Sequence, residues 1–102
     1  MAAESIDGSV REWTFLTNHA HVLVALHRDP DARIRDLAAA VGITERAVQS
    51  ILGDLEGSGY VERERTGRRN HYRIRSDLTF RHPAEASEPI GALLAIFGGS
   101  SA

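Results

Sequence analysis

The spacing of small, glycine and aliphatic residues between Arg35 and Leu52 constrains the fold of this chain more than any other feature. Ala38 lies four residues before Gly42, and Val48 lies six residues after it. Two helices that cross near a right angle need a small side chain where they touch, a glycine where the chain reverses and an aliphatic anchor beneath the second helix. The segment therefore predicts a helix-turn-helix unit.

The periodicity places further helices around this unit. Apolar residues recur at helical spacing from Trp13 to Leu26, which predicts a helix that Thr17 caps and Asp29-Pro30-Asp31 ends. Residues 32–34 read as a short extended segment. Helices are then expected over 35–41, ending at Gly42, and over 45–57, with Thr44 as N-cap.

After the third helix the apolar period changes to two. Residues 60–65 and 71–75 alternate as strands, and residues 66–70 join them, which predicts an antiparallel hairpin with a basic tip. Pro89 suits the first turn of a last helix. The element order predicts an α+β, mainly α, winged helix-turn-helix fold: a three-helix core, a β-hairpin wing and a C-terminal helix. We expect one domain over 13–97, with flexible tails over 1–12 and 98–102.

The net charge of −2 hides a strong asymmetry. Residues 63–81 hold seven arginines and two acids, a net charge of +5, whereas the rest of the chain holds five arginines and twelve acids, a net charge of −7. A local basic segment on an acidic body is typical of a surface that binds a polyanion. All twelve basic residues are arginines, so arginine content alone means little, and the clustering carries the argument.

Four short motifs carry a resemblance to a known family. They are Phe15–His19 (FLTNH), Gly42–Gln49 (GITERAVQ), Gly67–Tyr72 (GRRNHY) and Arg81–Pro83 (RHP). Residues 31–75 resemble winged helix-turn-helix bacterial repressors of the MarR and ArsR type, and residues 13–97 are similar to small, single-domain actinobacterial regulators of that type. The resemblance implies DNA binding and transcription regulation, and no particular effector. Full MarR proteins carry long terminal dimerisation helices, whereas this chain has only short apolar pieces there.

The expected DNA contacts fall on the third helix and on the hairpin. Arginine bonds guanine bidentately and glutamine bonds adenine, so Arg46 and Gln49 are expected to read bases in a major groove. The start of helix 45–57 suits a phosphate. The wing, residues 63–75, is expected on the backbone and in an adjacent minor groove. The predicted DNA-binding residues are Thr44, Glu45, Arg46, Gln49, Ser50, Arg65, Arg68, Arg69, Asn70 and His71.

The sequence lacks the residues that several classes of function require. There is no cysteine, the five histidines are scattered, and neither a serine–histidine–acid arrangement nor a phosphate-binding glycine loop occurs. We therefore expect no enzyme activity, no metal and no cofactor. Residues 1–11 lack the apolar stretch of a signal peptide, and no apolar run approaches the roughly 20 residues of a membrane span, which favours a cytoplasmic location.

The chain ends favour a homodimer. A short apolar helix is unstable alone in water, and a two-fold pairing of the two ends would cover it. The expected interface residues are Trp13, Phe15, Leu16, Ile90, Leu93, Leu94 and Phe97. In the alternative, the last helix folds back on its own domain. A small-molecule effector between residues 13–15 and the connector 82–89 stays open.

Two other functions compete with a sequence-specific regulator. A winged helix can serve as a protein-docking module, because fold does not fix function, but such a module does not need a basic wing. A nonspecific architectural or RNA-binding protein needs a broader basic surface than this chain provides.

Overall fold

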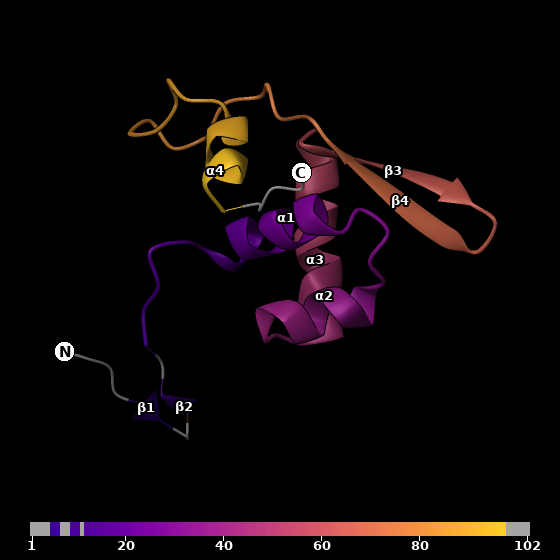
Figure 1. The fold of residues 1–102 in the computed structure, drawn as a ribbon. Helices are drawn as coiled ribbons and strands as arrows, with labels where there is room; N and C mark the ends of the chain where they lie inside the picture. Colours follow the sequence, from indigo (N-terminus) through magenta and orange to yellow (C-terminus); the bar gives the residue numbers. More distant parts are fainter. Residues whose placement is uncertain (1–4, 7–8, 11, 98–102) are drawn as a thin grey trace.

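Three helices form the centre of the structure, a computed structural model that describes residues 5–6, 9–10 and 12–97 (Figure 1). They are α1 (Asn18–Arg28), α2 (Ile34–Val41) and α3 (Glu45–Gly57). The hydroxyl oxygen of Thr17 accepts a hydrogen bond from the Ala20 N–H at 3.3 Å, and that of Thr44 accepts one from the Ala47 N–H at 3.0 Å. Each bond satisfies an N–H group that the first helical turn leaves free, so both predicted N-caps are confirmed.

Gly42 makes the turn between α2 and α3. Its φ is +85°, in the left-handed region, and its N–H donates to the carbonyl of Ala38 at 2.8 Å. A side chain at this φ would be strained, so the chain reversal favours glycine. Ala38 and Val48 are both buried in the core, as their spacing predicts. The helix-turn-helix unit is confirmed.

The segment before α2 differs from the prediction. Residues 32–34 form no strand, because Ile34 already belongs to α2, and the carboxylate of Asp36 accepts the backbone N–H of Arg33 to cap this earlier start. One backbone bond links the preceding loop to the hairpin, from the Tyr72 N–H to the carbonyl of Pro30 at 2.9 Å. Pro30 has no backbone N–H, so it cannot donate a second hydrogen bond to β4 as a paired strand residue would.

The hairpin consists of β3 (Val61–Thr66) and β4 (Arg69–Ile74), paired antiparallel. Thr66 pairs with Arg69, so Gly67 and Arg68 alone form the turn, and Gly67 has a φ of +62°. A two-residue turn with a left-handed glycine matches the twist of the strands. The predicted hairpin is confirmed, but the five-residue link over 66–70 is wrong, because Arg69 and Asn70 belong to β4.

One cluster of buried side chains joins the helices and the base of the hairpin. Its members include Val22, Leu23, Leu26, Leu37, Ala38, Val48, Ile51, Leu52, Leu55, Val61, Tyr72, Ile90 and Leu94. The hairpin contributes Val61 and Tyr72 near its base, while its tip projects beyond the helices (Figure 1). The architecture is the mainly helical winged helix-turn-helix fold that the sequence predicts. Within the described residues, no helix is long and apolar enough to cross a membrane.

The last helix, α4 (Ile90–Phe97), folds back on its own domain. Its residues Ile90, Leu93 and Leu94 are 4%, 8% and 3% exposed, and α4 contacts α1. Arg28 of α1 donates to the carbonyl of Phe97 at 2.6 Å, which fixes the end of α4. The expectation that these three side chains face a second copy is therefore corrected, because the core of their own domain already covers them.

Large apolar side chains remain exposed at both ends of the domain. Trp13 and Phe15 precede α1, and their side chains are 71% and 90% exposed. The two rings pack edge to face, with 4.8 Å between their centroids. On α4, Ile96 and Phe97 are 70% and 45% exposed. Of the expected tail over 1–12, the structure describes the paired strands β1 (Ser5–Ile6) and β2 (Ser9–Val10) and residue 12. The tail over 98–102 lies outside the described residues.

Candidate nucleic-acid interface

The N-terminal half of α3 presents a polar face to solvent. Val48 is fully buried, and Ile51, Leu52 and Leu55 line the inner side of the helix. The outward positions of the first two turns are Glu45, Arg46, Gln49 and Ser50, all exposed, with the exposed cap Thr44 before them. The structure thus brings together all five α3 residues predicted from the sequence. The free N–H groups and the dipole make this end of α3 locally positive.

The acids in the second half of α3 are held by neighbouring residues. The carboxylate of Asp54 lies 2.8 Å from His19 Nε2, and that of Glu56 lies 3.3 Å from Arg63 Nε. These contacts direct both carboxylates toward α1 and the hairpin base. The first two turns of α3 are left with Arg46 as their basic side chain.

Side chains on the hairpin alternate between two faces. Cross-strand partners point the same way, so Arg63 and Arg65 share a face with buried Val61 and Tyr72, and Arg63 reaches Glu56 of α3. Glu62, Glu64, Arg69, His71 and Arg73 lie on the opposite face. Arg65 is therefore on the α3 side of the hairpin, while Arg69 and His71 are not.

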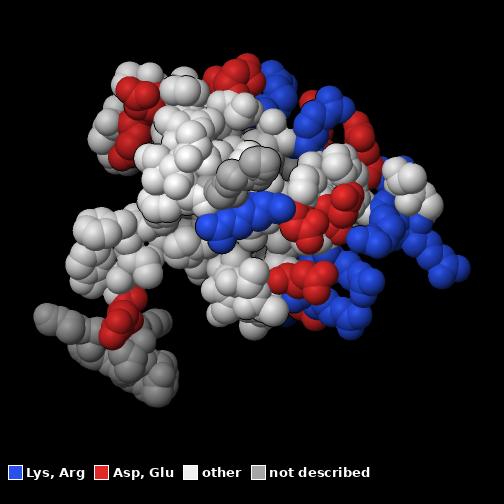
Figure 2. Space-filling model, viewed as in Figure 1, with Lys and Arg blue, Asp and Glu red and all other residues white. Residues whose placement is uncertain are grey.

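Several arginines of the basic segment are neutralised in place. Arg63 pairs with Glu56, Arg73 with Glu64 and Arg75 with Asp77. The pKa of the Arg73 guanidinium is raised above its ordinary value by its hydrogen bond to Glu64 and by the nearby charges of Glu64 and Glu62. Figure 2 shows basic and acidic side chains next to one another on the face of the molecule in view. The charge available to a polyanion is smaller than the sequence count indicates.

The turn of the hairpin keeps its basic side chains available. Within the described residues, neither Arg65 nor Arg68 has an acid within 4.0 Å. Arg65 Nε donates to the carbonyl of Gly67 at 3.1 Å, which holds this side chain against the turn. Arg68 is exposed and projects from the two-residue turn itself.

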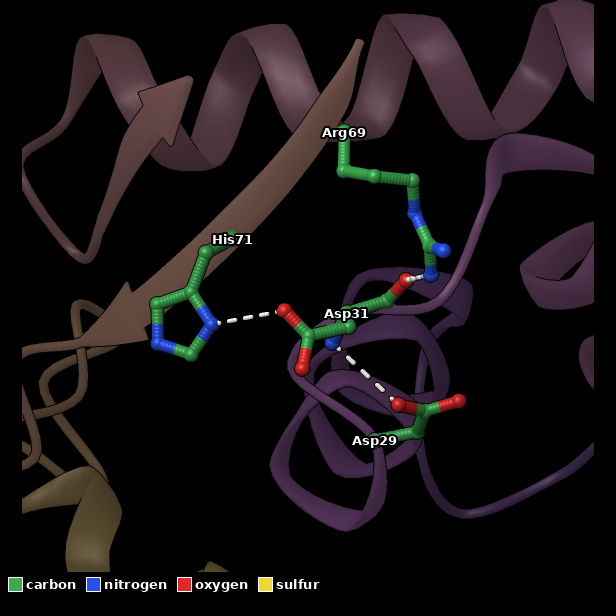
Figure 3. A network of polar contacts seen from close by, with 4 residues as sticks. All are labelled: Asp29, Asp31, Arg69 and His71. Carbon is green, nitrogen blue, oxygen red and sulfur yellow. Dashed lines mark hydrogen bonds and ion pairs between the residues drawn. The ribbon is translucent and has the colours of Figure 1, made fainter. Parts of the chain in front are cut away.

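The other three predicted hairpin residues, Arg69, Asn70 and His71, belong to β4 and not to the turn. Arg69 Nη2 donates to the carbonyl of Asp31 at 3.0 Å, and His71 Nδ1 lies 2.8 Å from the Asp31 carboxylate (Figure 3). Asn70 is half-buried, and its buried Oδ1 has no hydrogen-bond partner in the part of the chain that the structure describes. The structure places Arg69 and His71 beside the loop between α1 and α2, whereas Asn70 is the cross-strand partner of Arg65 and shares its face. The sequence did not reveal that Asp31 contacts Arg69 and His71, because Asp29-Pro30-Asp31 indicates only the end of a helix.

A second feature lies away from α3 and the hairpin tip. A cavity of about 520 Å³ opens between the start of α1 and the connector before α4. Its walls are mainly apolar, including Phe15 and Leu23, and the polar side chains that line it include Arg81, His82 and Glu85. It occupies the region between residues 13–15 and 82–89 that the sequence marks as a possible effector site.

The comparisons with known proteins agree with this architecture. A family model described as MarR family matches residues 14–69, which cover α1, the helix-turn-helix unit and β3. No curated protein matches the chain significantly. The match spans more than half of the chain.

Proposed function

The chain belongs to the MarR family of DNA-binding transcription regulators, and we propose that it binds double-stranded DNA sequence-specifically with recognition helix 45–57 and wing 63–75. The observation that carries the proposal is the exposed Arg46–Gln49 face on the capped half of α3. On the neighbouring hairpin, Arg65 and Arg68 have no acid within 4.0 Å among the described residues. Such a regulator acts where the DNA is, in the cytoplasm of a bacterium.

Base reading falls to Arg46 and Gln49. A helix enters the major groove readily, and these two side chains bond guanine and adenine in distinct patterns. Thr44 and the N–H groups at the start of α3 bind a phosphate beside the groove, with Glu45 and Ser50 at its edge. The carboxylates of Asp54 and Glu56 stay clear of the phosphates, because other residues hold them.

The wing supplies nonspecific affinity. Arg68 at the turn enters the adjacent minor groove, and Arg65 lies against the DNA backbone. Arg69 and His71 contact Asp31, and Asn70 is half-buried, which favours a supporting role over direct DNA contact for these three residues of β4.

The functional unit in this proposal is a homodimer. Family members typically form dimers, and among the described residues the large apolar side chains that remain exposed are Trp13, Phe15, Ile96 and Phe97. Leu16 and Phe97 line one groove beside α1, so the two ends of the domain meet there. A two-fold contact through this surface would place two recognition helices about 34–36 Å apart, on successive major grooves.

A small-molecule effector belongs to the proposal as well. The cavity beside α1 and the connector has mainly apolar walls, and Arg81, which also lines it, has no acid within 4.0 Å among the described residues. An apolar molecule with an anionic group fits this combination. Its binding would act on α1 and α4, on which the dimer surface depends.

Selection of bound fragments from genomic DNA by the purified protein tests the proposal. Enrichment of one motif, with two half-sites one helical turn apart, supports it. A folded protein that enriches no motif at any salt concentration favours the alternative, a winged-helix docking module without specific DNA binding.

A further inference from the structure

Asp31 stands in the loop between α1 and α2, yet it holds two side chains of β4 (Figure 3). Its carboxylate Oδ1 lies 2.8 Å from His71 Nδ1, and its carbonyl oxygen accepts from Arg69 Nη2 at 3.0 Å. An ionised carboxylate only accepts hydrogen bonds, so the His71 ring donates through Nδ1–H. The neighbouring Pro30 carbonyl accepts from the Tyr72 N–H. Two loop residues thus hold three residues of one strand.

The loop that carries Asp31 is itself fixed to the helical body. The Asp29 carboxylate accepts the Asp31 N–H at 3.2 Å, and the Asp29 carbonyl accepts the Ala32 N–H at 3.1 Å. An aspartate that bonds the backbone two residues later makes a local turn. The Asp29 N–H in turn donates to the Ala25 carbonyl at the end of α1. Asp31 is therefore anchored on α1 rather than carried along by the hairpin.

A two-stranded hairpin needs such an anchor. An isolated pair of strands is only marginally stable. Among the described residues no third strand pairs with β4, and one backbone hydrogen bond, from the Tyr72 N–H to the Pro30 carbonyl, links it to the loop before α2. The core holds the base of the hairpin through Val61 and Tyr72, but Arg68 lies at its far end. Arg69 and His71 lie between these two points, where a contact with the body limits rotation of the tip.

We propose that Asp31 is a positioning residue for the wing: through His71 and Arg69 it fixes the direction in which the turn and Arg68 point relative to α3. Because Asp31 is negatively charged, the direction of the change in DNA affinity on its removal tests the proposal. An acid beside a DNA-binding hairpin weakens attraction for phosphates, so electrostatics alone predicts tighter binding when it is removed. The positioning role predicts weaker binding. The use of the wing on DNA rests on the proposed function, whereas the contact itself does not.

The first experiment needs no DNA. The chain has no cysteine, so Ser50→Cys and Arg68→Cys introduce two unique spin labels, one on α3 and one at the turn. The labelled parent should give a narrow distance distribution, and Asp31→Ala a broad or displaced one. Asp31→Asn should restore the parent distribution, because its amide oxygen still accepts from Nδ1–H. His71→Ala removes the same bond from the other side and should match Asp31→Ala. An unchanged distribution in folded Asp31→Ala or His71→Ala overturns the proposal.

The second experiment measures binding to the selected site. Asp31→Ala should bind about threefold or more weakly, the loss expected for one hydrogen bond, while Asp31→Asn should bind at least as tightly as the parent. Glu62→Ala is the matched control: Glu62 is an exposed acid on β3 without an ion pair among the described residues, and its removal should tighten binding. On a duplex trimmed of the base pairs under the wing, Asp31→Ala and the parent should bind alike.

The outcomes separate the two proposals. Asp31→Ala that binds the full duplex as tightly as Glu62→Ala overturns the positioning role and leaves sequence-specific binding intact. A parent that binds no DNA overturns the proposed function, and the spin-label distances still decide whether Asp31 positions the hairpin.

Discussion

At the scale of single residues, Arg46 and Gln49 have the most specific expected effects. Their side chains are exposed, so replacement by alanine leaves the core unchanged. Arg46→Ala and Gln49→Ala should each weaken binding to the selected site by roughly 1–3 kcal/mol and change binding to random DNA little. Fluorescence anisotropy on both duplexes measures this. Equal losses on the two would reassign the residues to the DNA backbone.

Arg68 and Arg69 are adjacent arginines that the structure distinguishes. Arg68 is exposed at the turn, whereas Arg69 donates to the carbonyl of Asp31. Arg68→Ala should weaken binding to every sequence and reduce the slope of log affinity against log salt by about one unit. Arg69→Ala should leave that slope nearer the parent value. Salt titrations of the two variants side by side check the difference, and identical slopes for Arg68→Ala and the parent would remove the wing from the interface.

At the scale of elements, the turn of the helix-turn-helix can be tested with a pair of glycines. A methyl group at Gly42 or Gly53 meets no atom within 4 Å, so neither substitution causes a clash. Gly42 has a φ of +85°, and alanine there should lower the free energy of unfolding by about 1–2 kcal/mol. Gly53 is an exposed residue within α3, and alanine there should raise the free energy of unfolding by up to about 1 kcal/mol.

Urea unfolding of the two variants and the parent measures both changes. The two substitutions add the same methyl group, so shifts of opposite sign isolate the backbone conformation as the cause. A Gly42→Ala variant that is as stable as the parent would contradict the geometry of the turn, and destabilisation by Gly53→Ala would contradict the helical conformation of that residue in α3.

The elements also show how far the sequence alone could go. The caps, Gly42 and the inward face of α3 depend on local rules, and each was predictable from a few neighbouring residues. The hairpin register was not, because Thr66-Gly67-Arg68-Arg69-Asn70 contains no signal that distinguishes a five-residue link from a two-residue turn. That ambiguity moved Arg69 and Asn70 from the expected tip into β4.

Long-range contacts were hidden for a similar reason. An arginine cluster gives a charge count, but it does not tell which side chains meet Glu56, Glu64 or Asp77. The apolar stripe of α4 predicted a helix that must be covered, and it could not tell whether its own domain or a second copy covers it. Both questions depend on the tertiary arrangement.

At the scale of the whole molecule, the exposed ends predict the assembly. Light scattering of the parent should show a dimer at micromolar concentration, and the pair Phe15→Asp and Phe97→Asp should give a monomer with a similar melting temperature, because both side chains are exposed in the single chain. Leu94→Asp is the contrast: Leu94 is 3% exposed, so a charge there should unfold the domain. A monomeric parent, or a double variant that remains dimeric, would exclude this surface.

We expect the assembled molecule to distinguish one DNA sequence from others. The most direct measurement is the ratio of its affinities for the selected site and for a scrambled duplex of the same length and composition, at physiological salt. For a sequence-specific regulator we expect a ratio of about 10³ or higher, which falls steeply in the Arg46→Ala, Gln49→Ala double variant. A ratio near one for the folded, dimeric parent would contradict it.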